Sequence, residues 1–268
     1  MGKTIGVISI KGGVGKTSTV VALGAVLTHD FGQKVLLVDA NFSAPNLGIH
    51  LGIVKPDVTI HDVINGKAKI QDAIYEYDGI HVLPARVPPT KINKMNNFSA
   101  KLETLKPFYD IILIDSSPSM HEELLAAMTA SDEILVVTTP DYPTLSCTIY
   151  ATQIALKKNT PIVGIVLNKV RNKKFEVPIE EVEHCAGASV LAMLPDDVNI
   201  LAALANHIPS TSFSPKSNST IEYKKLAATL IKKTYRDERW KTKIKAVFHK
   251  VPNRCEINRS RIVDRIEF

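Results

Sequence analysis

The stretch "SIKGGVGKTSTV", residues 9–20, decides which fold this chain can adopt. It overlaps the end of the apolar run "TIGVISI" at 4–10, which has the length and composition of a buried strand, and it leads into a predicted helix at 17–30. A glycine-rich loop between a strand and a helix presents backbone N–H groups and the positive end of the helix dipole to a polyphosphate. The sequence therefore predicts a phosphate-binding loop.

The residue types in this loop suit a bound nucleotide. The glycines lack the Cβ that would block a close approach of the backbone, Lys16 can reach the β- and γ-phosphates, and the Thr17 hydroxyl can bind Mg²⁺. A glycine turn that binds nothing is the weaker alternative in this strand-loop-helix setting. The residues predicted to contact the nucleotide are Gly12, Gly13, Val14, Gly15, Lys16, Thr17 and Ser18.

A second lysine precedes the glycines. The usual pattern G-x-x-x-x-G-K-[ST] begins with glycine, but here Ile10 takes that place and Lys11 follows it. Within one subunit, a second lysine beside the phosphates is redundant. We expect Lys11 to reach the phosphates held by a second copy, where it supplies in trans the charge that an arginine finger supplies in other enzymes. The simpler alternative is a surface lysine.

Apolar runs rich in Val and Ile recur after the loop, with amphipathic stretches between most of them. Each run is about 5 to 7 residues long and apolar on successive residues, which is typical of strands covered on both faces. Buried helices are the weaker alternative, because the runs are short and end at Gly, Pro, Asp or Asn. The sequence thus predicts an α/β fold, a doubly wound and mainly parallel sheet with helices on both faces. The predicted strands lie in "KVLLVD", "GIHVLP", "DIILID", "EILVVTTP", "PIVGIVLN" and "ASVLAMLP", and the predicted helices at 17–30, 121–129, 142–157, 178–186, 196–206 and 220–235.

Two of these strands end in carboxylates suited to Mg²⁺. Asp115 ends the third of the listed runs, where a carboxylate can hold Mg²⁺ through water, and "SSPSM" at 116–120 follows as a loop that can sense a γ-phosphate. Asp39 ends the second strand of the chain, where metal-binding and switch residues lie in such sheets. Asn41 follows it as a candidate for positioning water, with a plain turn residue as the alternative. The predicted catalytic residues are Lys11, Lys16, Asp39 and Asn41, and the predicted metal-binding residues are Thr17, Asp39 and Asp115.

A later strand end resembles the start of a guanine-binding motif. Asn168 and Lys169 match the first half of N-K-x-D, but Arg171 stands where that motif has Asp. Without the carboxylate that accepts from guanine N1 and N2, the Asn168 amide is better suited to the N6 and N7 edge of adenine. The sequence therefore favours ATP over GTP. Pro195 and Asp197 are placed to line the base or the ribose, although Asp197 is equally expected as a helix N-cap.

The bulk composition indicates a cytosolic globular protein. A chain of 268 residues with 45% hydrophobic content can bury one sizeable core. The cysteines Cys147, Cys185 and Cys255 are far apart, which argues against a zinc ribbon or a disulfide framework. We see neither a leader peptide nor an apolar run long enough to span a membrane. We therefore expect the protein in the cytosol.

Charge is unevenly distributed along the chain. Residues 232–268 hold 12 of the 33 Lys+Arg but 5 of the 27 Asp+Glu, which is a net charge of +7. The remaining residues, 1–231, hold 21 basic and 22 acidic side chains. We therefore expect a compact domain over 1–235 and a basic tail over 236–268.

The basic tail contains a predicted amphipathic helix. Trp240, Ile244, Val247 and Phe248 fall at i, i+4, i+7 and i+8, while lysines and an arginine occupy the rest of the helical wheel. Such a helix can lie in an anionic membrane interface, where each lysine adds about 1 kcal/mol. Two copies on one face of a dimer would bind more tightly than one, through effective concentration. The alternative is a helix that packs on the domain or on a partner.

The loop "KGGVGKTS" resembles the deviant Walker A motif of the MinD/ParA class of P-loop ATPases, in which Lys11 would be the signature lysine. Together with "VTIHDVINGKAKIQDAIY", "IILIDSSPS" and "GIVLNKV", it makes roughly residues 1–235 similar to the archaeal MinD branch. The resemblance implies a P-loop NTPase fold, ATP and Mg²⁺ as cofactors, and a monomer that ATP converts into a sandwich dimer. Each signature lysine would contact the other subunit's nucleotide, and hydrolysis would reverse dimerisation. The resemblance also implies spatial positioning at the inner face of the cell membrane, with a recruited or activating protein of unknown identity.

Two features depart from that family. Its members commonly carry two aspartates spaced i, i+2 at the end of the second strand, whereas this chain has Asp39 and Asn41. An amide can orient water but cannot accept its proton, so help worth ~10²-fold is missing and we predict slow hydrolysis. The second departure is the extension "NRCEINRSRIVDRIEF" at 253–268, which the sequence leaves open as a contact for lipid, nucleic acid or a partner protein.

Other functions compete with a membrane-bound switch. A ParA-like ATPase that binds DNA non-specifically in partitioning is the main alternative, because a basic surface attracts the duplex. The aligned apolar stripe of the tail favours lipid, since a DNA-binding patch does not need one. An iron–sulfur scaffold ATPase of the same fold requires paired cysteines, and the three scattered cysteines do not provide them. Asn41 leaves a nucleotide-binding module without hydrolysis open.

Overall fold

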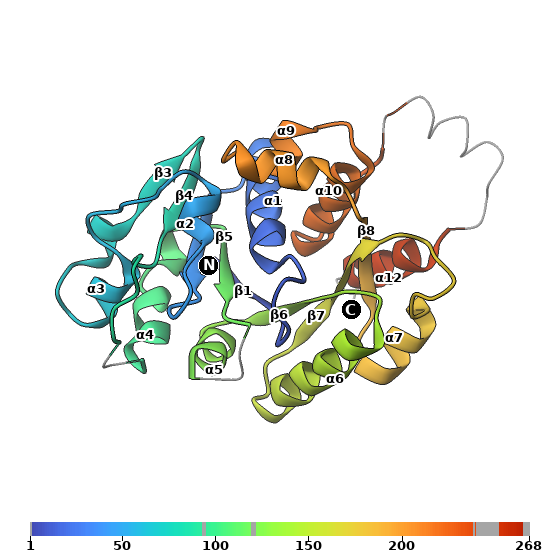
Figure 1. The fold of residues 1–268 in the computed structure, drawn as a ribbon, viewed down its shortest axis with the longest axis horizontal. Helices are drawn as coiled ribbons and strands as arrows, with labels where there is room; N and C mark the ends of the chain where they lie inside the picture. Colours follow the sequence, from blue (N-terminus) through green and yellow to red (C-terminus); the bar gives the residue numbers. More distant parts are fainter. Residues whose placement is uncertain (1, 93–94, 119–121, 238, 240–251, 265–268) are drawn as a thin grey trace.

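The computed structural model describes residues 2–92, 95–118, 122–237, 239 and 252–264. Within them, one eight-stranded sheet runs through the molecule in the order β3-β4-β2-β5-β1-β6-β7-β8 (Figure 1). All neighbouring strands pair in parallel except β3 and β4. The predicted mainly parallel sheet is therefore confirmed. The strands are β1 Lys3–Ile8, β2 Val35–Ala40, β3 Tyr75–Tyr77, β4 Ile80–Leu83, β5 Ile111–Ser116, β6 Glu133–Thr138, β7 Ile162–Val170 and β8 Val190–Pro195.

Burial on both faces explains the continuous apolar runs. Every residue of β2 and β5 is buried. Leu37 and Leu113 belong to the core on one face of the sheet, and the preceding residues Leu36 and Ile112 belong to the core on the other. Because successive side chains of a strand point to opposite faces, a strand covered on both sides needs apolar residues at consecutive positions.

Helices cover both faces of the sheet (Figure 1). Helices α1 and α10 pack together on one face, where Tyr223 and Leu226 join the core around α1. On the other face, Leu124 of α5 and Leu145 of α6 share a core with β6. The α-helices are α1 Lys16–His29, α2 Leu47–His50, α3 Ile60–Ile64, α4 Asn97–Glu103, α5 Glu122–Thr129, α6 Tyr142–Lys157, α7 Ile179–Ala186, α8 Asn199–Ala205, α9 Ser210–Phe213, α10 Asn218–Leu230 and α12 Arg254–Val263, with 3-10 helices η1 Ile70–Ala73 and η2 Lys106–Phe108.

The short elements differ most from the sequence-based expectation. Strand β3 and helices α2, α3 and α9 have five residues or fewer, which is too short to show a periodic pattern. Helix α8 begins at Asn199 rather than near residue 196, with Val198 as its N-cap residue, and the Asp197 carboxylate before it accepts the Asn199 backbone N–H at 3.0 Å. Residue 121, at which the sequence predicts the start of a helix, lies outside the described residues, and α5 is described from Glu122.

Helix α12 lies within the stretch 236–268, and the division of the chain into a domain over 1–235 and a basic tail stays a prediction. The helix packs against β8 and α10, with Cys255, Asn258 and Arg259 buried. The Asn258 amide donates to the Val190 carbonyl at 2.8 Å, and Arg259 donates to the Leu191 carbonyl at 2.7 Å. This helix is docked by polar groups, so its sequence shows no apolar stripe that would reveal the docking.

The predicted amphipathic helix at Trp240, Ile244, Val247 and Phe248 lies outside the described residues. Of the helices that the structure does describe, none combines the length and the apolar composition that crossing a bilayer requires.

Candidate nucleotide-binding site

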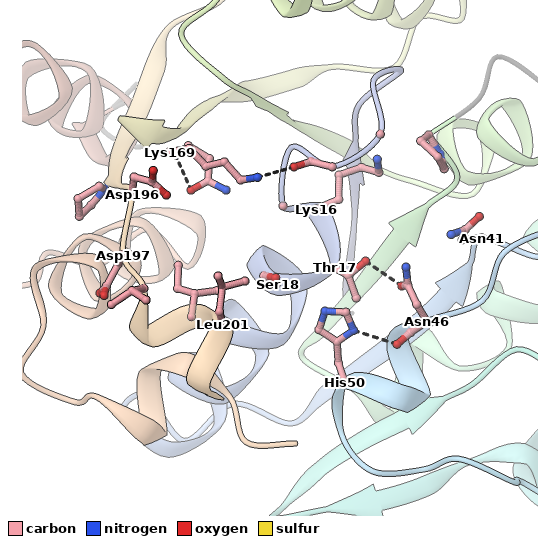
Figure 2. A pocket seen from close by; sticks show the side chains of 18 of the residues that line it. Lys16, Thr17, Ser18, Asn41, Asn46, His50, Lys169, Asp196, Asp197 and Leu201 are labelled. Atoms are coloured by element: carbon pink, nitrogen blue, oxygen red, sulfur yellow. Dashed lines mark hydrogen bonds between the residues drawn. The ribbon is translucent and has the colours of Figure 1, made fainter. Parts of the chain in front are cut away.

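A cavity of about 570 Å³ opens at the carboxyl end of the central strands, where the loop after β1 meets the first turn of α1. Its volume falls in the range of small-molecule sites. Parts of the chain far apart in sequence meet there, as Figure 2 shows. The lining residues are Gly12, Gly13, Gly15, Lys16, Thr17, Ser18, Asn41, Asn46, His50, Ser116, Pro118, Asn168, Lys169, Pro195, Asp196, Asp197, Val198, Ile200 and Leu201.

The glycine loop has a backbone that other residues do not readily adopt. Gly13 and Gly15 have φ angles of 75° and 96°, in the left-handed region that favours glycine. A Cβ on Gly15 would lie 2.3 Å from Nδ2 of Asn168. The close approach of Asn168 therefore requires glycine at position 15.

Lys16 and Thr17 meet the strand-end carboxylate Asp115 at the base of this loop. The Thr17 hydroxyl donates to Oδ2 of Asp115 at 2.6 Å. Burial lowers the pKa of Lys16, and the charge of Asp115 offsets part of that effect. Burial also raises the pKa of Asp115 to about 6, although the Thr17 hydroxyl and the Lys16 charge act in the opposite direction.

Asp39 lies beside Asp115 in the adjacent strand and is fully buried. Its carboxylate accepts the backbone N–H groups of Asn41, Asn46 and Leu47 at 3.0 to 3.2 Å. Burial and the charge of Asp115 raise the pKa of Asp39 well above its usual range in spite of these bonds. Asp39 thus holds the segment after β2 in place, and it does not line the cavity itself.

These two carboxylates fit a bound Mg²⁺. They are neighbours in a buried place, and Oδ1 of Asp115 has no hydrogen-bond partner within the described part of the chain. A divalent cation would relieve the repulsion between them, and Mg²⁺ is commonly held by one or two carboxylates together with phosphates and water. Thr17 and Asp115 would hold the ion, and it would neutralise charge on the phosphates.

Asn41 faces the cavity from the segment after β2. It is buried, and its amide Nδ2 donates to the Ala44 carbonyl at 2.5 Å. Its Oδ1 has no partner among the described residues. Orienting a water molecule near the phosphates therefore stays a prediction for this acceptor atom.

At the base-binding end, the Asn168 amide has a role that sequence reasoning missed. Its Nδ2 donates to the Val14 carbonyl at 2.8 Å, and Lys169 Nζ donates to the Gly13 carbonyl at 2.8 Å. Both side chains therefore brace the phosphate loop. The second N–H of the Asn168 amide stays available, so its contact with adenine remains a prediction.

Pro195 and Asp197 both line the cavity, and their contact with a base or a ribose stays a prediction. The Asp197 carboxylate accepts from Asn199 and from the Ser219 hydroxyl at 2.6 Å, but the N-cap residue of α8 is Val198 rather than Asp197. Val198 and Leu201 add an apolar wall that sequence reasoning missed, with 75% and 67% of their surface exposed. An exposed apolar pair of this kind suits the face of a base.

Asn46 and His50 also line the cavity and were not predicted. An oxygen of the Asn46 side chain lies 3.0 Å from the Thr17 hydroxyl, and His50 Nδ1 lies 2.9 Å from the Asn46 carbonyl (Figure 2). A carbonyl only accepts, so Nδ1 of His50 carries the hydrogen. The signal that could have found Asn46 is an Asn just before a short helix and close after a strand-end aspartate.

Lys11 does not line the cavity, although its neighbour Gly12 does. Lys11 Nζ lies 2.7 Å from the Thr144 hydroxyl and 3.2 Å from Oδ1 of Asp141. Burial raises the pKa of Asp141, but hydrogen bonds from Thr139, Thr144 and Lys11 outweigh it and lower the pKa to about 2. The ammonium group is therefore held outside its own phosphate loop by a charged carboxylate.

Together these features define a P-loop protein that binds a nucleotide with Mg²⁺. A family model described as an AAA domain matches residues 2–163. The septum site-determining protein MinD of Thermotoga maritima is 32% identical over 240 residues, which are 85% of this chain and 87% of that protein. The solved structure of the cell division ATPase MinD of Pyrococcus furiosus covers 87% of this chain and 99% of its own, with a TM-score of 0.81 and 33% identity. The solved structure of the septum site-determining protein MinD of Pyrococcus horikoshii, complexed with Mg-ADP, covers 94% of this chain and 100% of its own. Its TM-score is 0.80 and its sequence identity is 28%.

This chain therefore belongs to the MinD/ParA family of P-loop ATPases, and its archaeal branch fits. The protein is an ATPase with ATP and Mg²⁺ as its cofactors, as the sequence predicted.

Proposed function

We propose that this ATPase is a MinD-like positional switch, which dimerises with ATP at the inner face of the cell membrane and recruits other proteins there. In this proposal ATP joins two copies and slow hydrolysis releases them. The switch acts in spatial positioning, at the division site or in polar machinery. The observation that supports it most directly is the place of Lys11.

Lys11 lies next to the glycines of the phosphate loop, but its ammonium group lies outside the nucleotide cavity. Asp141 and Thr144 hold the ammonium group outside the nucleotide cavity, and 40% of the side chain is exposed. A lysine so placed adds little to binding of its own nucleotide. The triphosphate of a second copy would offer it several negative charges in a water-excluded interface, where electrostatic attraction is strongest.

Asn41 supports slow hydrolysis. Its amide is tied to the Ala44 carbonyl and offers one free acceptor atom, so it can orient a water molecule without accepting its proton. An ATP dimer that hydrolyses slowly would persist long enough to recruit a partner. The phosphate loop and Mg²⁺ residues would still provide most of the stabilisation of the transition state.

Membrane attachment is proposed for the basic segment between α10 and α12. Residues 232–268 carry a net charge of +7, and the apolar residues Trp240, Ile244, Val247 and Phe248 fall on one side of a helical wheel. Because α10 and α12 pack against each other, both ends of the connecting segment start from the domain. In a dimer two such segments would reinforce each other on one anionic surface.

Light scattering tests dimerisation and membrane coupling together. The full chain is measured with ADP, ATP and a non-hydrolysable analogue, with and without vesicles containing anionic lipid. We expect the mass to double with ATP and the dimer to bind vesicles. Lys11→Ala should abolish the doubling while leaving ATP binding within about threefold, since Lys11 lies outside its own cavity. Doubling that survives Lys11→Ala, or no doubling in the wild type, would contradict the proposal.

The competing function is a ParA-like ATPase that binds DNA non-specifically. The basic tail supports it, because twelve Lys and Arg residues at 232–268 would attract a duplex. A gel-shift assay with a random duplex, run beside co-sedimentation with anionic vesicles, separates the two. ATP-dependent, steeply salt-sensitive DNA binding without vesicle binding would favour the partition function.

A further inference from the structure

Glu123 is a buried carboxylate that the nucleotide site does not use. It lies in the first turn of α5 with 8% of its surface exposed, and it does not line the nucleotide cavity. The Ser43 hydroxyl donates to its Oε1, and Oε2 has no partner within the described residues. The partner, Ser43, is 80 residues away in the chain and belongs to the segment after β2.

Other contacts also hold the segment around Ser43. The Asn41 backbone N–H donates to Asp39 and its side chain to the Ala44 carbonyl. The Phe42 ring packs edge-on against Phe98 with ring centroids 5.4 Å apart. These contacts hold residues 41–44 in place, and the Ser43 hydroxyl adds a hydrogen bond to α5, whose Ala127 shares a hydrophobic core with Phe42.

Among the described residues no ion pair involves Glu123, and the imidazole of His61, on which the charge of Glu123 acts, is not a cation near pH 7. His61 is fully buried, and its Nδ1 accepts the Arg86 backbone N–H at 3.1 Å, so the hydrogen is on Nε2. Burial lowers the pKa of His61, although the Phe42 carbonyl and the charges of Asp62 and Glu123 act in the opposite direction. The imidazole is therefore neutral near pH 7, and the Ser43 hydroxyl is the described hydrogen-bond partner of Glu123.

The two segments that this contact joins border the same part of the cavity. Asn41 lines it from the segment after β2, and Ser116 and Pro118 line it from the segment after β5. The strands β2 and β5 are neighbours, with Asp39 paired to Asp115. Helix α5 comes next in the chain after this second segment, beyond residues 119–121, which the structure does not describe, so the bond from Ser43 ties the segment after β2 to that helix.

We propose that Ser43 and Glu123 are a pair of positioning residues, which makes the two segments beside the γ-phosphate move as one unit and so keeps Asn41 aligned with the attacking water. The inference rests on the proposed function, since it requires ATP hydrolysis at this nucleotide site. It goes further by coupling the segment after β2 to the segment after β5. Fixing several groups in one geometry before the reaction lowers the entropic part of the barrier, so the pair affects the rate rather than affinity.

Single-turnover hydrolysis of bound Mg-ATP tests the pair in the full chain. We expect Glu123→Ala and Ser43→Ala each to lower the rate by about three- to tenfold, with ATP affinity within about twofold of the wild type. The double variant should be no slower than either single variant, because both remove the same contact. Glu123→Gln keeps an acceptor for Ser43 and should recover most of the rate. Glu122→Ala is the matched control, an exposed glutamate in the same turn, and should hydrolyse at the wild-type rate.

A second measurement does not depend on hydrolysis. Amide hydrogen exchange with a non-hydrolysable ATP analogue should increase protection in residues 41–46 and 122–129 of the wild type, but in only one of these segments in Ser43→Ala. The inference would be overturned if the effects of the two alanine variants on the rate were additive, or if ATP affinity fell as much as the rate. It would also be overturned if Ser43→Ala still gained protection in both segments with the ATP analogue. Failure of the proposed switch would appear separately, as a wild type that stays monomeric with ATP.

Discussion

Asn41 differs from an aspartate only in carrying an NH₂ group where the carboxylate has an oxygen, and that group decides whether the side chain can take a proton from water. Its Nδ2 donates to the Ala44 carbonyl, and its Oδ1 is left as an acceptor. The residue is buried at the edge of the cavity. We therefore predict that the rate of hydrolysis depends on this one functional group.

Asn41→Asp is expected to raise ATP turnover by about tenfold or more, because a carboxylate can both orient and deprotonate the attacking water. Steady-state phosphate release measures the change. The assay is run near pH 8, since the new carboxyl would lie close to Asp39 and Asp115, whose pKa values are raised. Thermal unfolding serves as the control for lost folding. An unchanged or lower rate in a folded variant would remove Asn41 as the cause of slow hydrolysis.

Gly15→Ala is expected to weaken ATP binding by about tenfold or more, because the new Cβ would push away the Asn168 amide that braces the loop. Isothermal titration measures the affinity. Gly66→Ala is the matched control, since Gly66 also has a positive φ, of 77°, but has open space around its Cβ. Both variants should lose about 1–2 kcal/mol of unfolding free energy through the strained backbone. Equal ATP affinities in the two variants would show that Asn168 does not need glycine at position 15.

Helix α12 shows at the scale of an element how polar groups can attach a segment to a domain. Its capping box joins Asn253 and Glu256, and its buried side Cys255, Asn258 and Arg259 is mostly polar. Arg259 donates to the Leu191 carbonyl and pairs with Glu222 at 3.1 Å. A buried guanidinium with two such partners is costly to leave unpaired, so this one position carries much of the docking.

Arg259→Ala is expected to undock α12 and to lower the unfolding free energy by about 2–3 kcal/mol, since it removes the partner of the Leu191 carbonyl and leaves Glu222 with Lys225 alone. Urea unfolding measures the loss, and thiol labelling of Cys255 in a Cys147→Ser, Cys185→Ser background reports undocking. Burial raises the pKa of the Cys255 thiol to about 12, so it should react slowly while docked.

Arg261→Ala is the control for this prediction. Arg261 lies in the same helix but is exposed, so its loss should change stability by no more than about 0.5 kcal/mol. If both variants behaved alike, or if Cys255 reacted rapidly in the wild type, α12 would not be docked as described.

For the whole molecule, the buried carboxylates link stability to pH and to the metal. Asp115 has its pKa raised from 3.8 to about 6, so the folded protein without a nucleotide binds a proton there that the unfolded chain has released. The contribution of Asp115 to stability is therefore present below about pH 4 and is lost as the pH rises through about 6. Binding of Mg²⁺ is favoured at high pH instead, because the ion binds the deprotonated carboxylate.

The stabilisation by Mg-ADP should consequently be full at pH 7.5 and fall as the pH is lowered through about 6. Thermal unfolding with and without Mg-ADP measures it, and at 100 times the dissociation constant the gain should be about 2.7 kcal/mol. Adding EDTA at pH 7.5 should remove the part of the gain that depends on the metal. Asp115→Asn should make the metal-dependent part of the stabilisation much less dependent on pH. A gain that is the same at pH 5.5 and pH 7.5 would show that Asp115 does not hold the metal.

Local pattern alone determined the class of this protein. The informative patterns are local: runs of buried Val and Ile, a glycine loop between a strand and a helix, and aspartates at strand ends. Because each pattern involves only residues that are close in the chain, the parallel sheet, the ATP and Mg²⁺ cofactors and the ATPase family could all be predicted. Dimerisation, membrane contact and the individual roles of the site residues stay predictions.

Tertiary structure decided what distant residues do to one another. The Lys11 contact with Asp141, the Asn168 contact with Val14, the docking of α12 on β8 and the link from Ser43 to Glu123 each join residues far apart in the chain. Such contacts are set by which strands are neighbours and by their register. A local sequence pattern does not encode that register, so these partners appear only once the sheet is assembled.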